Sequence, residues 1–102
     1  MHPLIETNRS AIADLCCRHQ VRRLEVFGSI LRDDFDARRS DVDVLVEFAP
    51  GAPSSFGEFL DLKEALEALF GRPVDLVEAR TVRNRRLKQH IDRSKAPVYA
   101  AA

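Results

Sequence analysis

The sequence contains Val26-Phe27-Gly28-Ser29-Ile30-Leu31-Arg32 and, after residues 33–39, Ser40-Asp41-Val42-Asp43-Val44-Leu45-Val46-Glu47-Phe48. The first motif predicts a strand that ends in a Gly-Ser turn, and the second predicts a strand that opens with Asp-x-Asp. Because side chains alternate between the two faces of a strand, the carboxylates of Asp41 and Asp43 point the same way, about 7 Å apart. The valines between and after them point to the opposite face, which predicts a core on that side.

Two like charges on one face of a strand favour a bound cation. Mg²⁺ binds oxygen ligands, typically one or two carboxylates together with the phosphates of a substrate. Gly28 leaves room for a ligand, and Ser29 offers a hydroxyl and an N–H to a phosphate, more so if residues 29–31 begin a helical turn. The combination predicts nucleotide chemistry. Each motif alone has a plainer explanation, because Gly-Ser is often only a turn and acids are common at the solvent end of a strand.

A third acid stands in the strand predicted for residues 73–78. Asp75 takes one face of this strand, and its two apolar neighbours take the other. An acid inside an apolar strand is costly to bury unless it is paired or binds a metal, so Asp75 is the best candidate for a carboxylate beside Asp41 and Asp43. The alternatives are that Asp75 lies in water at a sheet edge or pairs with an arginine. Two glutamates nearer the strand ends are weaker candidates, Glu47 and Glu78.

With these motifs in this order, the chain resembles the minimal nucleotidyltransferase (MNT) family of the DNA polymerase β-like nucleotidyltransferases. The family signature is roughly Gly-Ser-x-Ala-Arg-Gly, a short connection to Ser-Asp-x-Asp, and then an apolar strand. The corresponding residues here are Gly28-Ser29-Ile30-Leu31-Arg32-Asp33 and Ser40-Asp41-Val42-Asp43. Leu31 and Asp33 replace the usual Ala and Gly. The similarity extends over nearly the whole chain, including the Gly-Arg-Pro-Val-Asp-Leu-Val segment that begins at Gly71.

The resemblance implies an α+β fold, a small mixed β-sheet flanked by helices, as in the polymerase β-like nucleotidyltransferases. It also implies an Mg²⁺-dependent transfer of AMP from ATP, with Asp41, Asp43 and Asp75 as the catalytic residues that hold two metal ions. The residues that it implies for nucleotide binding are Gly28, Ser29, Arg32 and Ser40. The implied acceptor is a tyrosine hydroxyl of a partner HEPN toxin, so the chain is expected to be the antitoxin of a HEPN–MNT pair.

Other functions remain open at this point. The domain could neutralise its partner by binding alone, as a non-catalytic module. It could also adenylylate small molecules such as aminoglycosides, although enzymes of that kind usually carry an additional helical domain. The sequence has no glycine-rich Walker pattern and no dinucleotide-binding fingerprint, so it lacks the commonest other phosphate-binding motifs. A homo-oligomer is also compatible with the sequence.

Length and composition predict one soluble domain over residues 1–102. Sixteen basic and sixteen acidic side chains cancel, so the net charge gives no reason to expect binding to nucleic acid or membranes. No apolar run approaches the roughly 20 residues of a membrane helix, and a cytoplasmic location is expected. Cys16 and Cys17 are adjacent and have no metal-site spacing, so we expect at least one of them to pack in the core.

Hydrophobic periodicity predicts the other elements. They are a helix over Leu4–His19, a strand over Val21–Phe27, a helix that is capped by Ser54 or Ser55 with Glu58 and ends near Phe70, and a last helix over Thr81–Ala96. The last helix is rich in Lys and Arg, which indicates a solvated basic face or a surface for an acidic partner. After it, Val98 and Tyr99 are expected to dock back onto the body of the domain.

Overall fold

The computed structural model of this protein describes residues 2–32, 35–36, 38–52 and 56–101. Its centre is a four-stranded sheet in the order β3-β2-β1-β4. β1 pairs antiparallel with β2 and with β4, whereas β2 and β3 run parallel. The strands are β1 (Val21–Phe27), β2 (Val42–Phe48), β3 (Val74–Glu78) and β4 (Ala96–Ala100). The expected mixed sheet flanked by helices is confirmed.

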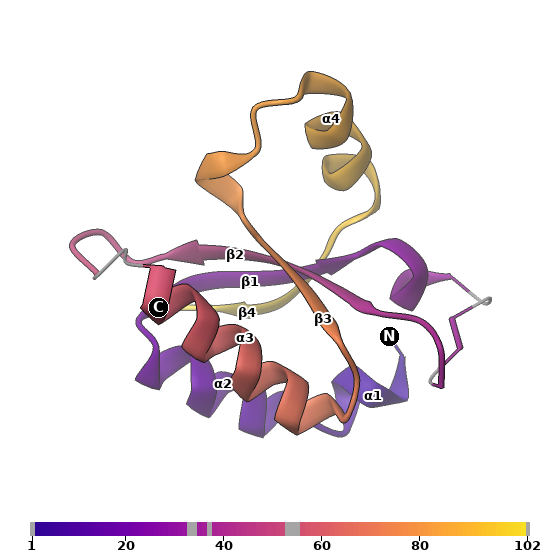
Figure 1. The fold of residues 1–102 in the computed structure, drawn as a ribbon, viewed down its shortest axis with the longest axis horizontal. Coiled ribbons are helices and arrows are strands. Elements are labelled where there is room, and N and C mark those ends of the chain that lie inside the picture. The colour runs from indigo at the N-terminus through magenta and orange to yellow at the C-terminus, as the bar shows by residue number, and fades with distance from the viewer. Residues whose placement is uncertain (1, 33–34, 37, 53–55, 102) are drawn as a thin grey trace.

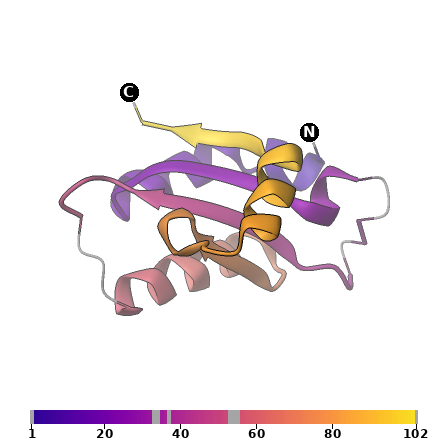
Figure 2. The same cartoon turned by 90° about the horizontal axis from the view of Figure 1, so that it is seen from above.

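The helices form unequal layers on the two faces of the sheet (Figures 1 and 2). One face is covered by α1, α2 and α3, and α4 crosses the other face (Figure 1). Their bounds are α1 (Pro3–Glu6), α2 (Arg9–Arg18), α3 (Phe56–Phe70) and α4 (Arg85–Ser94), with short 3-10 helices η1 (Gly28–Leu31) and η2 (Ala79–Thr81). Across the residues that the structure describes, no helix combines the length and apolar character needed to cross a bilayer.

The main core lies between the sheet and α1–α3. Val42, Val44 and Val46 alternate along β2 and are fully buried in it, as the sequence pattern predicts. Ile12, Cys16, Leu62 and Leu66 fill it from the helices and are also fully buried, which confirms the packing role expected of one cysteine. A smaller cluster forms on the other face, where Phe27, Leu45 and Ile91 pack between β1, β2 and α4. The second face of the sheet is therefore covered only in part.

The single helix predicted over Leu4–His19 is wrong, because α1 and α2 are separate helices. The side-chain amide of Asn8 donates to the Leu4 carbonyl oxygen at 2.8 Å, which is a local hydrogen bond that competes with a continuous helix. The backbone of Asn8, with φ −105° and ψ 10°, lies outside the helical region. The predicted cap of α3 by Ser54 or Ser55 falls outside the described residues, as does Asp33.

The last helix is shorter than predicted. Asn84 caps α4 by accepting the Leu87 N–H at 3.0 Å, so residues 81–84 precede the helix. At the other end, Lys95 is extended, and residues 96–100 form β4 against β1. Proline at position 97 is tolerated there because β4 is an edge strand of the sheet. The expected docking of Val98 and Tyr99 is thus the pairing of a fourth strand.

Candidate active site

The three candidate acids meet where β2 and β3 begin. Asp43 and Asp75 are register partners in the parallel pair, so their side chains share the sheet face that α4 crosses. Asp41 comes directly before β2. Asp43 is half-buried, whereas Asp41 and Asp75 are exposed. The structure therefore brings together the acids from two distant parts of the sequence at one edge of the sheet.

Asp75 also fits one of the plainer explanations, since β3 is an edge strand and this side chain lies in water. Among the described residues, however, Asp75 forms no ion pair with an arginine. Val74 and Leu76 on either side of it are buried, as the alternation predicts. The charge of Asp75 acts instead on Asp43, its neighbour across the strand pair.

The pKa of Asp43 responds to its burial and to the charges around it. Burial raises the pKa of Asp43 above its ordinary value, and the charges of Asp75 and Asp41 raise it further. The guanidinium of Arg32 acts in the opposite direction and lowers this pKa. Arg32, from the first motif, is therefore near enough to Asp43 to stabilise negative charge at the site.

Gly28 lies against the central acid of the group. Its φ of +74° is in the left-handed region, which side chains disfavour, and a Cβ at this position would collide with the Asp43 carboxylate. Phe27, just before it, pairs with Asp43 across β1 and β2. Ser29 is the second residue of η1, directly after Gly28, and is half-buried. The Gly-Ser motif and the Asp-x-Asp motif thus form one corner of the sheet.

Ser40 has a structural contact of its own. Its hydroxyl oxygen accepts the N–H of Asp36 at 3.0 Å, and its own N–H donates to the Asp36 carbonyl at 2.7 Å. Its carbonyl oxygen accepts from Arg72, a residue that no sequence argument singled out. In the sequence, Arg72 is notable only because it directly precedes the strand predicted for residues 73–78.

The donor set fits a hard divalent cation that also binds a substrate. Within the described residues, no group of three or more His, Cys, Asp or Glu side chains forms a ready-made metal cage. Mg²⁺ does not require such a cage, because one or two carboxylates and the phosphates of a bound nucleotide satisfy it. Burial and the charges of Asp75 and Asp41 raise the pKa of Asp43, and a cation bound at this corner would oppose that rise.

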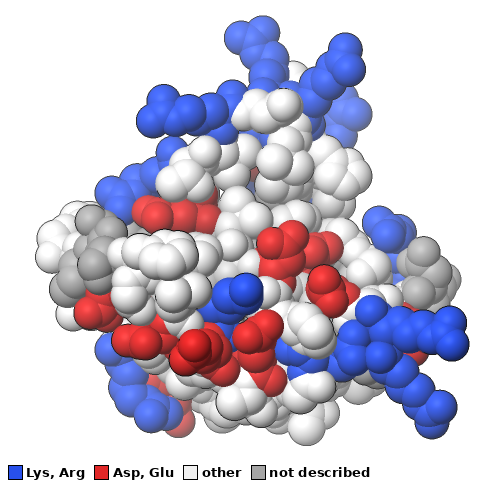
Figure 3. All heavy atoms as spheres, viewed as in Figure 1, with Lys and Arg blue, Asp and Glu red and all other residues white. Residues whose placement is uncertain are grey.

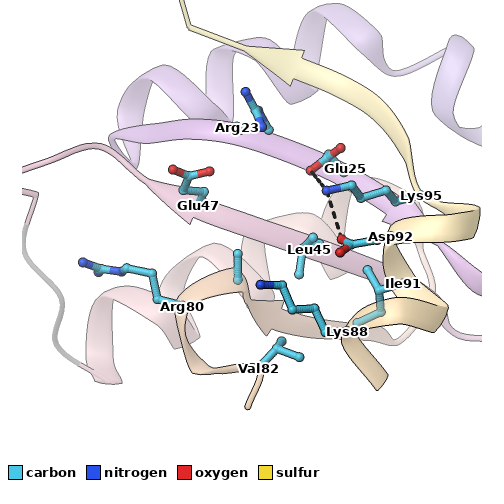
Figure 4. A pocket seen from close by; sticks show the side chains of 11 residues that line it. Arg23, Glu25, Leu45, Glu47, Arg80, Val82, Lys88, Ile91, Asp92 and Lys95 are labelled. Atoms are coloured by element: carbon cyan, nitrogen blue, oxygen red, sulfur yellow. Dashed lines mark ion pairs between the residues drawn. The ribbon is translucent and has the colours of Figure 1, made fainter. Parts of the chain in front are cut away.

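A cavity of about 280 Å³ lies on the same face of the sheet, under α4 (Figure 4). Lys95 pairs at its wall with Glu25 at 3.5 Å and with Asp92 at 3.3 Å. Glu47 lines this cavity, and Glu78 pairs with Arg80 at 2.9 Å. The two weaker acidic candidates are thus engaged away from the Asp41–Asp43–Asp75 group.

Basic side chains gather over α4 (Figure 3). Arg85, Arg86, Lys88 and Arg93 are all exposed on this helix. The observation agrees with the solvated basic face predicted from the sequence.

Comparison with known proteins identifies the family. A family model described as a nucleotidyltransferase domain matches residues 9–97. A “putative protein adenylyltransferase” of Methanocaldococcus jannaschii is 35% identical over 75 residues, which cover 74% of each chain.

Two solved structures share the fold. One, described as a “putative minimal nucleotidyltransferase”, has a TM-score of 0.74 and 37% identity and covers 95% of this chain and 96% of its own. Another is described as a tri-AMPylated Shewanella oneidensis HEPN toxin in complex with an MNT antitoxin. It has a TM-score of 0.68 and 19% identity, with 95% of this chain and 73% of that chain covered. Fold, corner motif and sequence agree, and the chain belongs to the nucleotidyltransferase domain family, as its resemblance to the minimal members predicted.

Proposed function

We propose that this protein is a protein adenylyltransferase that transfers AMP from ATP to a tyrosine hydroxyl of a HEPN-domain toxin and so acts as its antitoxin. Family membership and the adenylyltransferase relative support the reaction, and the neighbour with an AMPylated HEPN toxin supports the acceptor. The single observation that carries the proposal is the register pairing of Asp43 with Asp75 beside Gly28.

The acids would hold Mg²⁺, up to two ions, through Asp41, Asp43 and Asp75. When bound, the metal supplies charge neutralisation for the triphosphate and activation of the attacking hydroxyl. In the reaction, the tyrosine oxygen forms a bond to the α-phosphorus, the bond from that phosphorus to the β-phosphate oxygen breaks, and pyrophosphate leaves with the electron pair. We assign to Asp75, the exposed acid of β3, a role in accepting the tyrosine proton.

Gly28, Ser29 and Arg32 would position the phosphates. The absence of a side chain at Gly28 keeps space beside the Asp43 carboxylate. Ser29 is available as a hydrogen-bond donor to phosphate oxygens, and the Arg32 charge, which already acts on Asp43, would stabilise the departing pyrophosphate. Ser40 would contribute by shaping the loop before Asp41, consistent with the hydrogen bonds of its hydroxyl and carbonyl.

The wider context is part of the same proposal. Residues 1–102 would act as one catalytic domain in the cytoplasm, where ATP is available and the toxin is made. Direct nucleic-acid binding is not required for the reaction, and a homo-oligomer remains compatible with it.

A transfer assay tests the function. The protein is incubated with ATP labelled at the α-phosphate, Mg²⁺ and the product of the neighbouring toxin gene, and label on the toxin is measured. We expect label on a tyrosine with the wild type and a loss of at least about 100-fold with Asp43→Asn or Asp75→Asn.

Other results would contradict the proposal. Neutralisation of the toxin that survives both substitutions without label transfer would identify a non-catalytic binding module. Label that appears only on an added aminoglycoside, and never on the toxin, would identify a small-molecule adenylyltransferase.

A further inference from the structure

Arg72 connects the two strands that carry the acids. It lies between the end of α3 and the start of β3 and is half-buried. Its Nε and Nη2 atoms donate to the Ser40 carbonyl oxygen at 3.1 and 3.0 Å, and its Nη1 donates to the Arg38 carbonyl oxygen at 2.7 Å. One planar guanidinium therefore holds two carbonyls of the segment that leads directly into Asp41.

The backbone continues the same connection. The N–H of Val42 donates to the Pro73 carbonyl oxygen at 3.0 Å, next to the Arg72 contacts. On the other side of the segment, the Val74 N–H donates to Glu67 Oε2 at 2.9 Å, which ties the first residue of β3 to α3. The residues on both sides of Asp41 are thus held by Arg72 and Pro73, directly before β3, and the start of β3 is held by α3.

Asp41 is exposed and lies just outside the paired strands. Asp41 precedes β2, so the register of the sheet fixes Asp43 and Asp75 but does not fix Asp41. The guanidinium of Arg72 is aimed at backbone carbonyls, whereas the arginine that acts on the charge of Asp43 is Arg32. Arg72 therefore influences the acids through the backbone conformation at Asp41.

We infer that Arg72 is a positioning residue that fixes Asp41 relative to Asp75 and thereby sets the spacing of the carboxylates toward a divalent cation. The inference rests on the proposed function only where it concerns catalysis. Residues that orient metal ligands from outside typically change metal affinity or activity by about 10–100-fold when they are replaced.

Metal binding without turnover provides the first test. Affinity for Mn²⁺ is measured by calorimetry and by electron paramagnetic resonance on the full chain with a non-hydrolysable ATP analogue. We expect Arg72→Ala to weaken Mn²⁺ binding about 10-fold or more, and Arg72→Lys to weaken it less, because an ammonium can reach the Ser40 carbonyl but cannot hold both carbonyls.

Arg9→Ala is the matched control. Arg9 also donates from Nη1 to a backbone carbonyl, that of Val98, at 3.3 Å, and it lies on α2, away from the acids. Its replacement removes a carbonyl contact together with an ion pair to Glu6, and it should leave Mn²⁺ affinity unchanged. Equal Mn²⁺ affinity in the wild type and in folded Arg72→Ala would overturn the inference, whatever the change in stability.

Hydrogen exchange of the metal-free protein provides the second test. Arg72→Ala should speed exchange of the Val42 amide at least about 10-fold relative to the wild type, with Val44 in mid-strand as the internal reference. Unchanged exchange at Val42 would also overturn the inference. If Arg72→Ala does not fold, the same comparison is made with Arg72→Lys.

The two proposals fail separately. If the wild type transfers no AMP but Arg72 variants lose Mn²⁺ affinity and Val42 protection, the proposed function is wrong and the positioning role stands. If the wild type transfers AMP and Arg72→Ala keeps its kcat, KM for ATP and Mn²⁺ affinity, the positioning role is wrong and the function stands.

Discussion

Gly28 combines two constraints in one residue. Its backbone has a φ of +74°, and the space where a Cβ would stand is taken by the Asp43 carboxylate. Either constraint alone would favour glycine. Together they explain why glycine stands at position 28, beside Asp43.

Substitution of Gly28 separates the two constraints. Gly28→Ala should lower the free energy of unfolding by about 1–2 kcal/mol from backbone strain alone, and the displaced Asp43 carboxylate should reduce AMP transfer about 10-fold or more. Denaturant unfolding and the transfer rate measure the two effects. Gly71→Ala is the matched control, because Gly71 has a φ of +66° and no atom within 4 Å of the added Cβ. Equal transfer rates in the two variants would contradict a specific role of Gly28.

Asp43 carries a stability cost in the metal-free protein. Burial and the neighbouring acids raise its pKa, so its ionised form is disfavoured in the fold. Asp43→Asn should therefore raise the Tm in the presence of EDTA by about 2–5 °C, while it abolishes transfer. Thermal unfolding with Asp14→Asn, an exposed acid on α2, as the control checks this expectation. A lower Tm for Asp43→Asn would contradict a destabilising effect of the ionised, half-buried carboxylate.

Cys16 predicts a dependence on alkaline pH. Burial raises the pKa of its thiol from 9.0 to about 12, so the folded chain keeps the proton after the unfolded chain has lost it. This contribution to stability is complete below pH 9 and is lost as the pH rises toward 12. Between pH 8 and pH 10, the wild type should lose about 1 kcal/mol more than Cys16→Ala in urea unfolding. Identical pH slopes in the two proteins would contradict a buried, protonated thiol.

At the scale of the element, alternation along the strands predicts the structure best. β1 has the predicted bounds, and in β2 Val42, Val44 and Val46 take one face of the strand and are fully buried in the main core. The helix ends could not be predicted in the same way. The break at Asn8 and the start of α4 both depend on a single side-chain hydrogen bond, which leaves no trace in the hydrophobic pattern.

The cap of α4 can be tested directly. Asn84 accepts the Leu87 N–H at 3.0 Å, and Ile91, two turns further along the helix, is the buried residue that anchors α4. Asn84→Ala should lower the free energy of unfolding by about 1 kcal/mol, measured in denaturant. Gln89→Ala, an exposed position inside the same helix, is the control and should be neutral or slightly stabilising. A neutral Asn84→Ala would mean that α4 is held by Ile91 alone.

At the scale of the whole molecule, the site depends on long-range pairing. The sequence indicates the three acids, because carboxylates interrupt apolar strands at positions 41, 43 and 75. It does not indicate Arg72, whose role follows only from the approach of the Arg38 and Ser40 carbonyls. From the sequence, Val98 and Tyr99 are expected only to dock onto the domain. The strand β4 is not predicted, because residues 96–100 form a strand by pairing with β1.

The parallel pairing of β2 with β3 has a consequence for how the protein is made. During synthesis, Gly28, Asp41 and Asp43 leave the ribosome before Asp75. The chain of α3 lies between β2 and β3, so it must be in place before these two strands pair. Contacts between residues so distant in the chain form slowly, because the intervening loop must first be closed. A nascent or partly unfolded copy therefore lacks the grouped carboxylates of the completed fold.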